Sequence, residues 1–145
     1  MIELGPCPYP KVLAAMHAES FQRPWTAAAF EDLLQSPGVM TFAAMADGEP
    51  LGFVLVRQLV DEAEILTIAV LPAARRSGVG GRLLHHVVSE IGGLHSLFIE
   101  VDVLNTGARA FYESLDFIQI GVRKNYYQLQ DGSRSDAIVM RRGMP

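Results

Sequence analysis

The sequence predicts a mixed α/β (α+β) fold, with helices packed around one sheet. Three observations lead to this class: β-branched apolar runs such as Ile65–Val70, a helical apolar face after Val79, and strands and helices that alternate along the chain. With 145 residues, half of them hydrophobic, the chain is expected to form a single domain over residues 1–145 with one core.

The first half is expected to begin with two helices, Pro10–Phe21 and Ala27–Leu34, the second capped by Thr26. The inward positions expected in the first helix are Val12, Leu13, Ala15 and Met16. Three strands are expected to follow, over Val39–Met45, Leu51–Val60 and Glu64–Val70. The dipeptide Asp47-Gly48 predicts a hairpin turn between the first two strands.

The second half repeats the alternation. Its expected elements are a helix over Ser77–Ile91, a strand over Leu97–Val101, a helix over Thr106–Leu115, and strands over Phe117–Tyr127 and Ala137–Arg141. Gly92-Gly93 is a typical helix stop, and Gln130–Ser135 is a polar loop between the last two strands. The strand–helix–strand unit from Glu64 to Val101 is expected to be parallel and right-handed.

The segment Arg75-Arg76-Ser77-Gly78-Val79-Gly80-Gly81-Arg82 joins a strand to the long helix. Its glycines leave backbone amides uncovered at a helix N-terminus, where the helix dipole favours anions. The segment therefore predicts a pyrophosphate cradle for a nucleotide-bearing cofactor; the alternative is a tight turn with solvated arginines. A P-loop is excluded because Gly81 is followed by Arg-Leu, and a dinucleotide loop because no third glycine stands at the position that its motif requires.

Charge and cysteine content narrow the function classes. The formal net charge of −4 argues against broad nucleic-acid binding but allows an acidic groove for a basic acceptor. The single cysteine, Cys7, cannot form an internal disulfide, and neither a signal peptide nor a membrane span is evident, which together predict a cytoplasmic protein. No metal is expected, because the adjacent His85 and His86 point apart on a helix.

Four ordered segments carry a family resemblance. They are Ile68-Ala69-Val70 leading into Arg75–Gly80, Ile99-Glu100-Val101 with Asn105, Ala110–Phe117, and Arg123-Lys124-Asn125-Tyr126-Tyr127 with Asp136–Met140. In this order they resemble the GNAT superfamily of N-acetyltransferases and, within it, the RimI-type ribosomal-protein-alanine N-acetyltransferases. The resemblance implies the GNAT fold: a central, mostly antiparallel twisted sheet, a parallel strand pair splayed at the acetyl-CoA site, and helices on both faces.

The same resemblance assigns the chemistry. Glu100 matches the family's general base, although a solvated carboxylate at a strand end is the alternative from the residues alone. Tyr112 matches the general acid that protonates the departing CoA sulfur, and its alternative is a core aromatic, the role expected for its neighbour Phe111. Asn105 matches a residue that bonds the pantetheine arm, caps the next helix, or does both.

Acetyl-CoA is the implied co-substrate. The residues expected to bind it are Ile68, Ala69, Val70, Arg75, Arg76, Ser77, Gly78, Val79, Gly80, Gly81, Arg82 and Asn105. A backbone amide near Ala69 or Val70 is expected to polarise the thioester oxygen. The residues expected to line the acceptor site are Trp25, Tyr126 and Tyr127; the alternatives are a hydrophobic staple for Trp25 and aromatic packing on the sheet for the two tyrosines.

The implied reaction is direct acetylation of a protein N-terminal α-amine, with the N-terminal alanine of a small-subunit ribosomal protein as acceptor. Acetylation of a small amine or a lysine remains an alternative, as does a CoA-binding module without turnover. The expected partner is the acceptor protein, with no direct nucleic acid, no membrane, and a monomer or weak dimer. Three residues depart from the family pattern: Asp116 replaces a glycine at a turn expected to need positive φ, and Asp102 and Leu104 leave the acceptor preference open.

Overall fold

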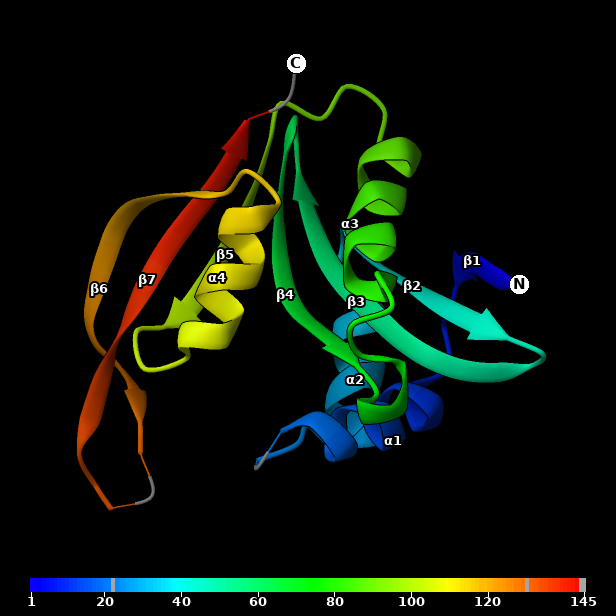
Figure 1. Cartoon of the computed structure of the whole chain (residues 1–145), viewed down its shortest axis with the longest axis horizontal. Coiled ribbons are helices and arrows are strands. Elements are labelled where there is room, and N and C mark those ends of the chain that lie inside the picture. Colours follow the sequence, from blue (N-terminus) through cyan, green and yellow to red (C-terminus); the bar gives the residue numbers. More distant parts are fainter. Residues whose placement is uncertain (22, 130, 144–145) are drawn as a thin grey trace. The chain divides into compact units, whose positions relative to one another are not determined.

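A computed structural model describes residues 1–21, 23–129 and 131–143 of the chain. These residues form seven β-strands, four α-helices and one short 3-10 helix (Figure 1). They divide into two compact units: Met1–Leu59 with Ile65–Gly93, and Val60–Glu64 with the chain from Leu94 onward. The expectation of one domain over residues 1–145 stays a prediction.

The first unit contains strands in the order β1-β2-β3-β4, and the pairs β1/β2 and β2/β3 are antiparallel. Its elements are β1 (Ile2–Pro6), α1 (Pro10–Ser20), α2 (Ala27–Leu34), β2 (Val39–Ala46), β3 (Glu49–Leu59), β4 (Glu62–Val70), the 3-10 helix η1 (Pro72–Ala74) and α3 (Val79–Glu90). The first three residues of β4 belong to the second unit. All elements expected in this part of the chain are present, with ends shifted by at most two residues.

Strand β1 is the addition that sequence reasoning missed. The segment Ile2–Pro6 contains a glycine and a proline and has no clear alternation, so its own pattern does not predict a strand. It forms because it pairs antiparallel along β2, from Ile2 opposite Ala46 to Pro6 opposite Phe42. This pairing spans some forty residues of sequence, and local pattern carries no signal for it.

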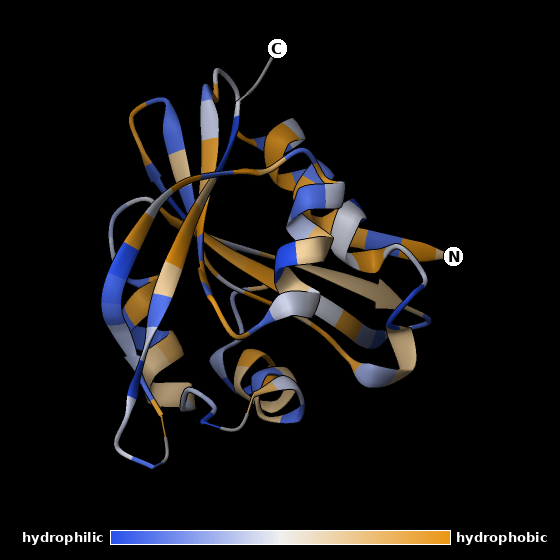
Figure 2. Cartoon of the chain, turned by 60° about the vertical axis from the view of Figure 1, so that its left-hand side comes forward, coloured by the Kyte–Doolittle hydropathy of each residue, from blue (hydrophilic) through white to orange (hydrophobic). Residues whose placement is uncertain are grey.

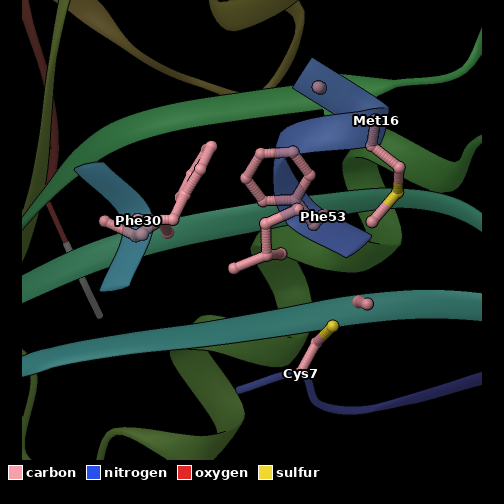
Figure 3. Packing of buried hydrophobic residues seen from close by; sticks show 8 residues of the cluster. Cys7, Met16, Phe30 and Phe53 are labelled. Atoms are coloured by element: carbon pink, nitrogen blue, oxygen red, sulfur yellow. The ribbon is translucent and has the colours of Figure 1, made fainter. Parts of the chain in front are cut away.

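Both faces of the first unit's strands are covered by helices. Ala43 on β2 and Phe53 on β3 pack in one cluster with Leu13 of α1 and Phe30 of α2 (Figure 3). The next residue along β2, Phe42, meets the ring of His86 on α3 edge-on, with ring centroids 4.9 Å apart. Because successive strand residues face opposite sides, α1 and α2 cover one face and α3 the other. Burial on two faces explains why β3 is apolar without alternation.

The inward face of α1 differs from the expectation at Ala15 and at His17. Leu13, Met16 and His17 are buried, whereas Ala15 is exposed and Ala14 is half-buried. Spacings of three and four residues place Leu13, Met16 and His17 on one side of a helix, and Ala15 lies outside that stripe. The polar nature of histidine concealed His17 as a core residue.

Turn and cap chemistry follow the sequence closely. Asp47 (φ 52°) and Gly48 (φ 80°) both have positive φ, as a two-residue hairpin turn requires. The Thr26 side chain caps α2 by accepting a hydrogen bond from the Ala29 amide at 3.1 Å. Helix α3 buries one apolar stripe, and Figure 2 shows hydrophobic and hydrophilic residues alternating along the helices.

The second unit contains strands in the order β5-β7-β6, with both pairs antiparallel. Its elements are β5 (Ser96–Asp102), α4 (Thr106–Ser114), β6 (Ile118–Gln128) and β7 (Arg134–Gly143). Asp116 has φ 70°, which confirms the positive φ expected there. The polar loop is shorter than expected because β7 begins at Arg134, and Gln130 lies outside the described residues. The parallel pairing expected between Glu64 and Val101 stays a prediction.

Candidate active site

The cradle segment forms a turn of unusual backbone geometry. After η1, Arg76 has φ 64° and Gly78 has φ 79°, and α3 begins at Val79, two residues later than expected. The Ser77 hydroxyl donates a hydrogen bond back to the Ala74 carbonyl. Residues 75–78 are exposed, so this turn presents its backbone to solvent.

The N-terminus of α3 has the features of an anion site. Its N-cap, Gly78, has no side chain to bond the first amides, and no acidic residue lies in the first turn. A Cβ added at Gly78 would meet nothing within 4 Å, so the space over the turn is open. The first amides of α3 have no partner within the helix, and together with the helix dipole they favour a phosphate group. The residues present therefore fit a pyrophosphate.

The three arginines of the segment are placed differently. The Arg75 Nε donates to the Val70 carbonyl at 3.1 Å, and the Arg82 Nη2 lies 3.5 Å from the Ile2 carbonyl. Arg76 is exposed and makes no hydrogen bond or ion pair with any described residue. Of the three, Arg76 is therefore the side chain most available to an incoming phosphate, while Arg75 and Arg82 each also contact a backbone carbonyl.

The segment Ile68-Ala69-Val70 forms the end of β4. Ala69 is buried in the core cluster, and Ile68 and Val70 are half-buried. A residue missed by sequence reasoning, Gly52 of β3, lies directly against this segment. A Cβ at Gly52 would lie 2.7 Å from the Ala69 carbonyl oxygen and 3.2 Å from the Val70 Cα. A glycine inside an apolar strand was the available signal for such a close approach.

In the second unit, Glu100 lies near the end of β5, opposite Val139 of β7. Its side chain is 15% exposed, and its Oε1 lies 2.9 Å from the Nε of Arg123. The carboxylate is therefore not the solvated strand-end group of the structural alternative, and it has an ion-pair partner. It is a largely buried anion with one cation on it.

Two tyrosines approach the same carboxylate. Tyr126 and Tyr127 lie edge-to-face with ring centroids 5.0 Å apart. The negative charge of Glu100, followed by partial burial and a hydrogen bond to that carboxylate, raises the pKa of Tyr126. Burial, and then the charge of Glu100, raises the pKa of Tyr127 to about 12. Both phenols therefore stay protonated at neutral pH, beside one carboxylate.

An irregularity in β6 places these side chains. The pairing with β7 shifts between Arg123, opposite Ala137, and Tyr127, opposite Ser135, so four steps on β6 face two on β7. Asn125 within it has φ 55°. The Asp136 carboxylate holds the bulge, accepting from the Asn125 amide at 2.9 Å and pairing with Lys124 at 3.4 Å. These two interactions lower the pKa of Asp136.

Tyr112 on α4 is 4% exposed, whereas Phe111 beside it is half-buried. The expectation that Phe111 is the core aromatic of this pair is wrong, because the buried face of α4 carries Tyr112 against Phe117, with centroids 5.5 Å apart. Burial, and then the nearby Tyr127, raises the pKa of Tyr112. Its hydroxyl makes no hydrogen bond to any described residue. Tyr112 is thus buried like a core aromatic but keeps an uncommitted donor.

The remaining candidates of this unit have structural partners. The Asn105 Oδ1 accepts from the Ala108 amide at 3.0 Å and so caps α4, which leaves its side-chain NH2 available to a ligand. The Asp102 carboxylate accepts from the Ser135 hydroxyl at 2.9 Å and from the Leu104 amide at 3.0 Å. Asp102 therefore has a local structural role, and Leu104 is exposed.

Trp25, in the first unit, packs into the core cluster as a half-buried residue. Its ring stacks on His17 with centroids 4.9 Å apart, and its backbone amide donates to the His17 Nδ1 at 3.0 Å. This geometry favours the structural alternative for Trp25, and its expected acceptor contact stays a prediction. Among the described residues, no group of three potential metal ligands converges and no helix is long and apolar enough to span a membrane.

Comparisons with known proteins agree on one family. The sequence pattern of the acetyltransferase (GNAT) family matches residues 11–117. The ribosomal protein bS18-alanine N-acetyltransferase of Escherichia coli (strain K12) is 37% identical over 131 residues, which cover 88% of this chain and 87% of that protein. A solved structure of the Escherichia coli ribosomal-protein-alanine N-acetyltransferase superposes with a TM-score of 0.89, covering 99% of this chain and 94% of that one, at 31% identity.

A second solved structure shares the fold at lower identity. Arabidopsis thaliana NAA60 in complex with acetyl-CoA superposes with a TM-score of 0.82 at 19% identity, covering 99% of both chains. The expected fold class is confirmed by these superpositions and by the antiparallel strand pairs within each unit.

Proposed function

The chain belongs to the acetyltransferase (GNAT) family, and from this premise we propose that it transfers the acetyl group of acetyl-CoA directly to the N-terminal α-amine of a protein. As acceptor we propose the N-terminal alanine of a small-subunit ribosomal protein, because the Escherichia coli relative carries that activity in its name. The same proposal places the protein in the cytoplasm. A monomer or weak dimer stays a prediction.

The cradle supports binding of the co-substrate. The amides of Val79, Gly80 and Gly81, which have no partner within α3, would hold the pyrophosphate together with Arg76. The backbone of Ile68–Val70 would hold the pantetheine arm. The Asn105 side-chain NH2, which the helix cap leaves available, stays a predicted contact of the cofactor. Acetyl-CoA, when bound, supplies an acetyl group activated as a thioester.

Glu100 is the proposed base. A peptide α-amine has a pKa of about 7.7–8.0, so at neutral pH most acceptor molecules arrive as ammonium ions and must lose a proton. The largely buried Glu100 carboxylate takes that proton, directly or through a water molecule, and passes it to solvent. The neutral nitrogen then attacks the thioester carbon, so that a C–N bond forms and the C–S bond breaks.

Tyr112 is the proposed donor to the departing sulfur. Its raised pKa keeps the phenol protonated, with its hydrogen available. A phenol with a pKa above the ordinary value of about 10 is a weaker acid than a thiol near 8.5. Tyr112 therefore acts first as a hydrogen-bond donor that stabilises the sulfur anion. The amine loses two protons overall, one through Glu100 to solvent and one that ends on the CoA sulfur.

The observation that carries this proposal is the gathering of three phenols and one carboxylate in the second unit. Glu100 perturbs Tyr126 and Tyr127, and Tyr127 in turn perturbs Tyr112. A carboxylate beside aromatic faces is a suitable environment for an ammonium group that must be deprotonated. The cluster is therefore better suited to binding an ammonium group than to packing of the sheet alone.

CoA release tests the proposal. One peptide carries a free N-terminal alanine followed by the ribosomal sequence, a second has a blocked N-terminus and an internal lysine, and a panel contains small amines. Turnover with the first peptide alone is the expected result. Turnover with the blocked peptide or with small amines would instead assign a lysine or a small-amine acceptor. Tight CoA binding with no turnover on any acceptor would indicate a binding module.

A further inference from the structure

The carboxylate of Glu100 is covered by a cation from the neighbouring part of the sheet. Arg123 places its Nε 2.9 Å from Glu100 Oε1, and the two side chains differ in exposure: 59% for Arg123 and 15% for Glu100. Among the ion pairs of the described residues, no other cation reaches Glu100, since Lys124 pairs with Asp136 instead. The anion is thus fixed in the protein, while the cation on it extends into solvent.

The difference in exposure between Arg123 and Glu100 affects the stability of their ion pair. A largely buried carboxylate left without a counter-charge is costly, so the free protein keeps a cation on Glu100. Arg123 itself is largely exposed, so its guanidinium can move from Glu100 into water at little cost. Glu100 is therefore more stable with a cation beside it, but that cation can be replaced by another.

The surroundings of the guanidinium also recognise cations. The Arg123 Cζ lies 5.6 Å from the centroid of the Tyr126 ring, within the range of a cation–π contact. The charge of the Glu100 carboxylate also acts on Tyr126, whose pKa it raises. A carboxylate oxygen, a phenol and an aromatic face together are the groups that bind a primary ammonium ion.

We propose that Arg123 occupies, in the free enzyme, the position of the acceptor's ammonium group, and that the acceptor displaces it from Glu100 on binding. This inference rests on the proposed function and adds to it a residue that competes with the acceptor for Glu100. An N-terminal ammonium replaces the guanidinium one charge for one, so Glu100 never loses its counter-charge.

The exchange has a consequence for the product. An acetylated N-terminus is a neutral amide and cannot pair with Glu100. Arg123 returns to the carboxylate as soon as the charge on the nitrogen is gone, and this return favours release of the product. To bind, the acceptor and the acetylated product must both break the ion pair between Arg123 and Glu100, at the same cost in free energy. Only the charged acceptor then forms a new ion pair with Glu100.

The test measures the affinity of two peptides for the protein saturated with CoA, by calorimetry. One peptide has a free N-terminal alanine and the other is its N-acetylated product, so neither measurement depends on turnover. Arg123→Gln is expected to tighten both peptides by about two- to fivefold, because neither then has to displace the pair. Arg123→Lys, which restores a cation, is expected to return both affinities toward wild type.

Lys124→Gln is the matched control, since it removes the same charge from the adjacent residue without touching Glu100. A loss of long-range repulsion alone would tighten only the charged peptide, and would do so in both Gln variants. Unchanged or weaker binding of the acetylated peptide to Arg123→Gln would overturn the inference. Absence of CoA release by the wild type would count against the proposed function, and the two binding measurements would still decide the role of Arg123.

Discussion

Acidification is expected to destabilise the first unit through His17. The imidazole is 2% exposed and stacks between Phe21 and Trp25, with centroids 4.1 and 4.9 Å away. Its Nδ1 accepts the Trp25 amide hydrogen at 3.0 Å, which requires an unprotonated nitrogen. Burial lowers the pKa of His17 from 6.5 to about 4.

The size and sign of the effect follow from proton linkage. Between pH 6.5 and about 4 the unfolded chain binds a proton at His17 and the folded chain does not, so stability falls as the pH falls through this window. Each pKa unit corresponds to about 1.4 kcal/mol, which gives a total loss of about 3 kcal/mol at pH 4 and about 2 kcal/mol at pH 5. Above pH 6.5 the contribution is complete and constant.

Urea unfolding at a series of pH values measures the effect. The chain has one tryptophan, Trp25, and it lies on His17, so its fluorescence reports directly on this cluster. His17→Asn keeps an acceptor for the Trp25 amide but cannot titrate. The variant is expected to be less stable at pH 7 and to lose much less stability between pH 6.5 and 4.5. Equal pH dependence in wild type and variant would refute the reasoning.

Three further variants test the site. Tyr112→Phe is expected to lower the turnover number at least tenfold with little change in acetyl-CoA affinity, by analogy with the loss of one donor to a developing anion; unchanged turnover would remove Tyr112 from the chemistry. Glu100→Gln is expected to slow CoA release most below the acceptor amine's pKa of about 7.7–8.0, where a base is needed most; a pH–rate profile parallel to wild type would contradict its role as base. Gly52→Ala would place its Cβ 2.7 Å from the Ala69 carbonyl oxygen. Thermal unfolding should therefore show a free energy of unfolding lower by about 1–3 kcal/mol, and acetyl-CoA should bind more weakly. Gly5→Ala, whose Cβ meets nothing within 4 Å, is the control and should be nearly neutral in both measurements.

The sequence predicted correctly those elements that are determined by residues close together in the chain. Thr26 before an alanine-rich helix and Asp47-Gly48 between apolar runs both encode their structure within a few residues, whereas the positive φ of Asp116 was expected from the glycine usual in the family. Strand β1 could not be predicted in this way, because its only support is the pairing with β2. The bulge around Asn125 depends likewise on Asp136, eleven residues further along the chain.

The candidate site shows the same division. The family resemblance identified Glu100, Tyr112, Tyr126 and Tyr127, and the structure brings them into one cluster, although their catalytic roles stay proposals. Spacing carried no information on which partner each side chain meets, so the cation on Glu100 was not predicted. Burial was also predicted incorrectly: helical periodicity places a buried stripe only to within one residue, so Tyr112 is buried where Phe111 was expected to be.

The chain's one thiol has a practical consequence. Cys7 is buried in the core cluster (Figure 3), where desolvation raises its pKa above the ordinary value, and both its backbone groups bond to Thr41. A protonated, shielded thiol reacts slowly with disulfide reagents and maleimides. Such reagents can therefore count released CoA in real time with little background from the folded enzyme. A cysteine introduced on the surface would also accept a probe selectively, with the natural sequence otherwise intact.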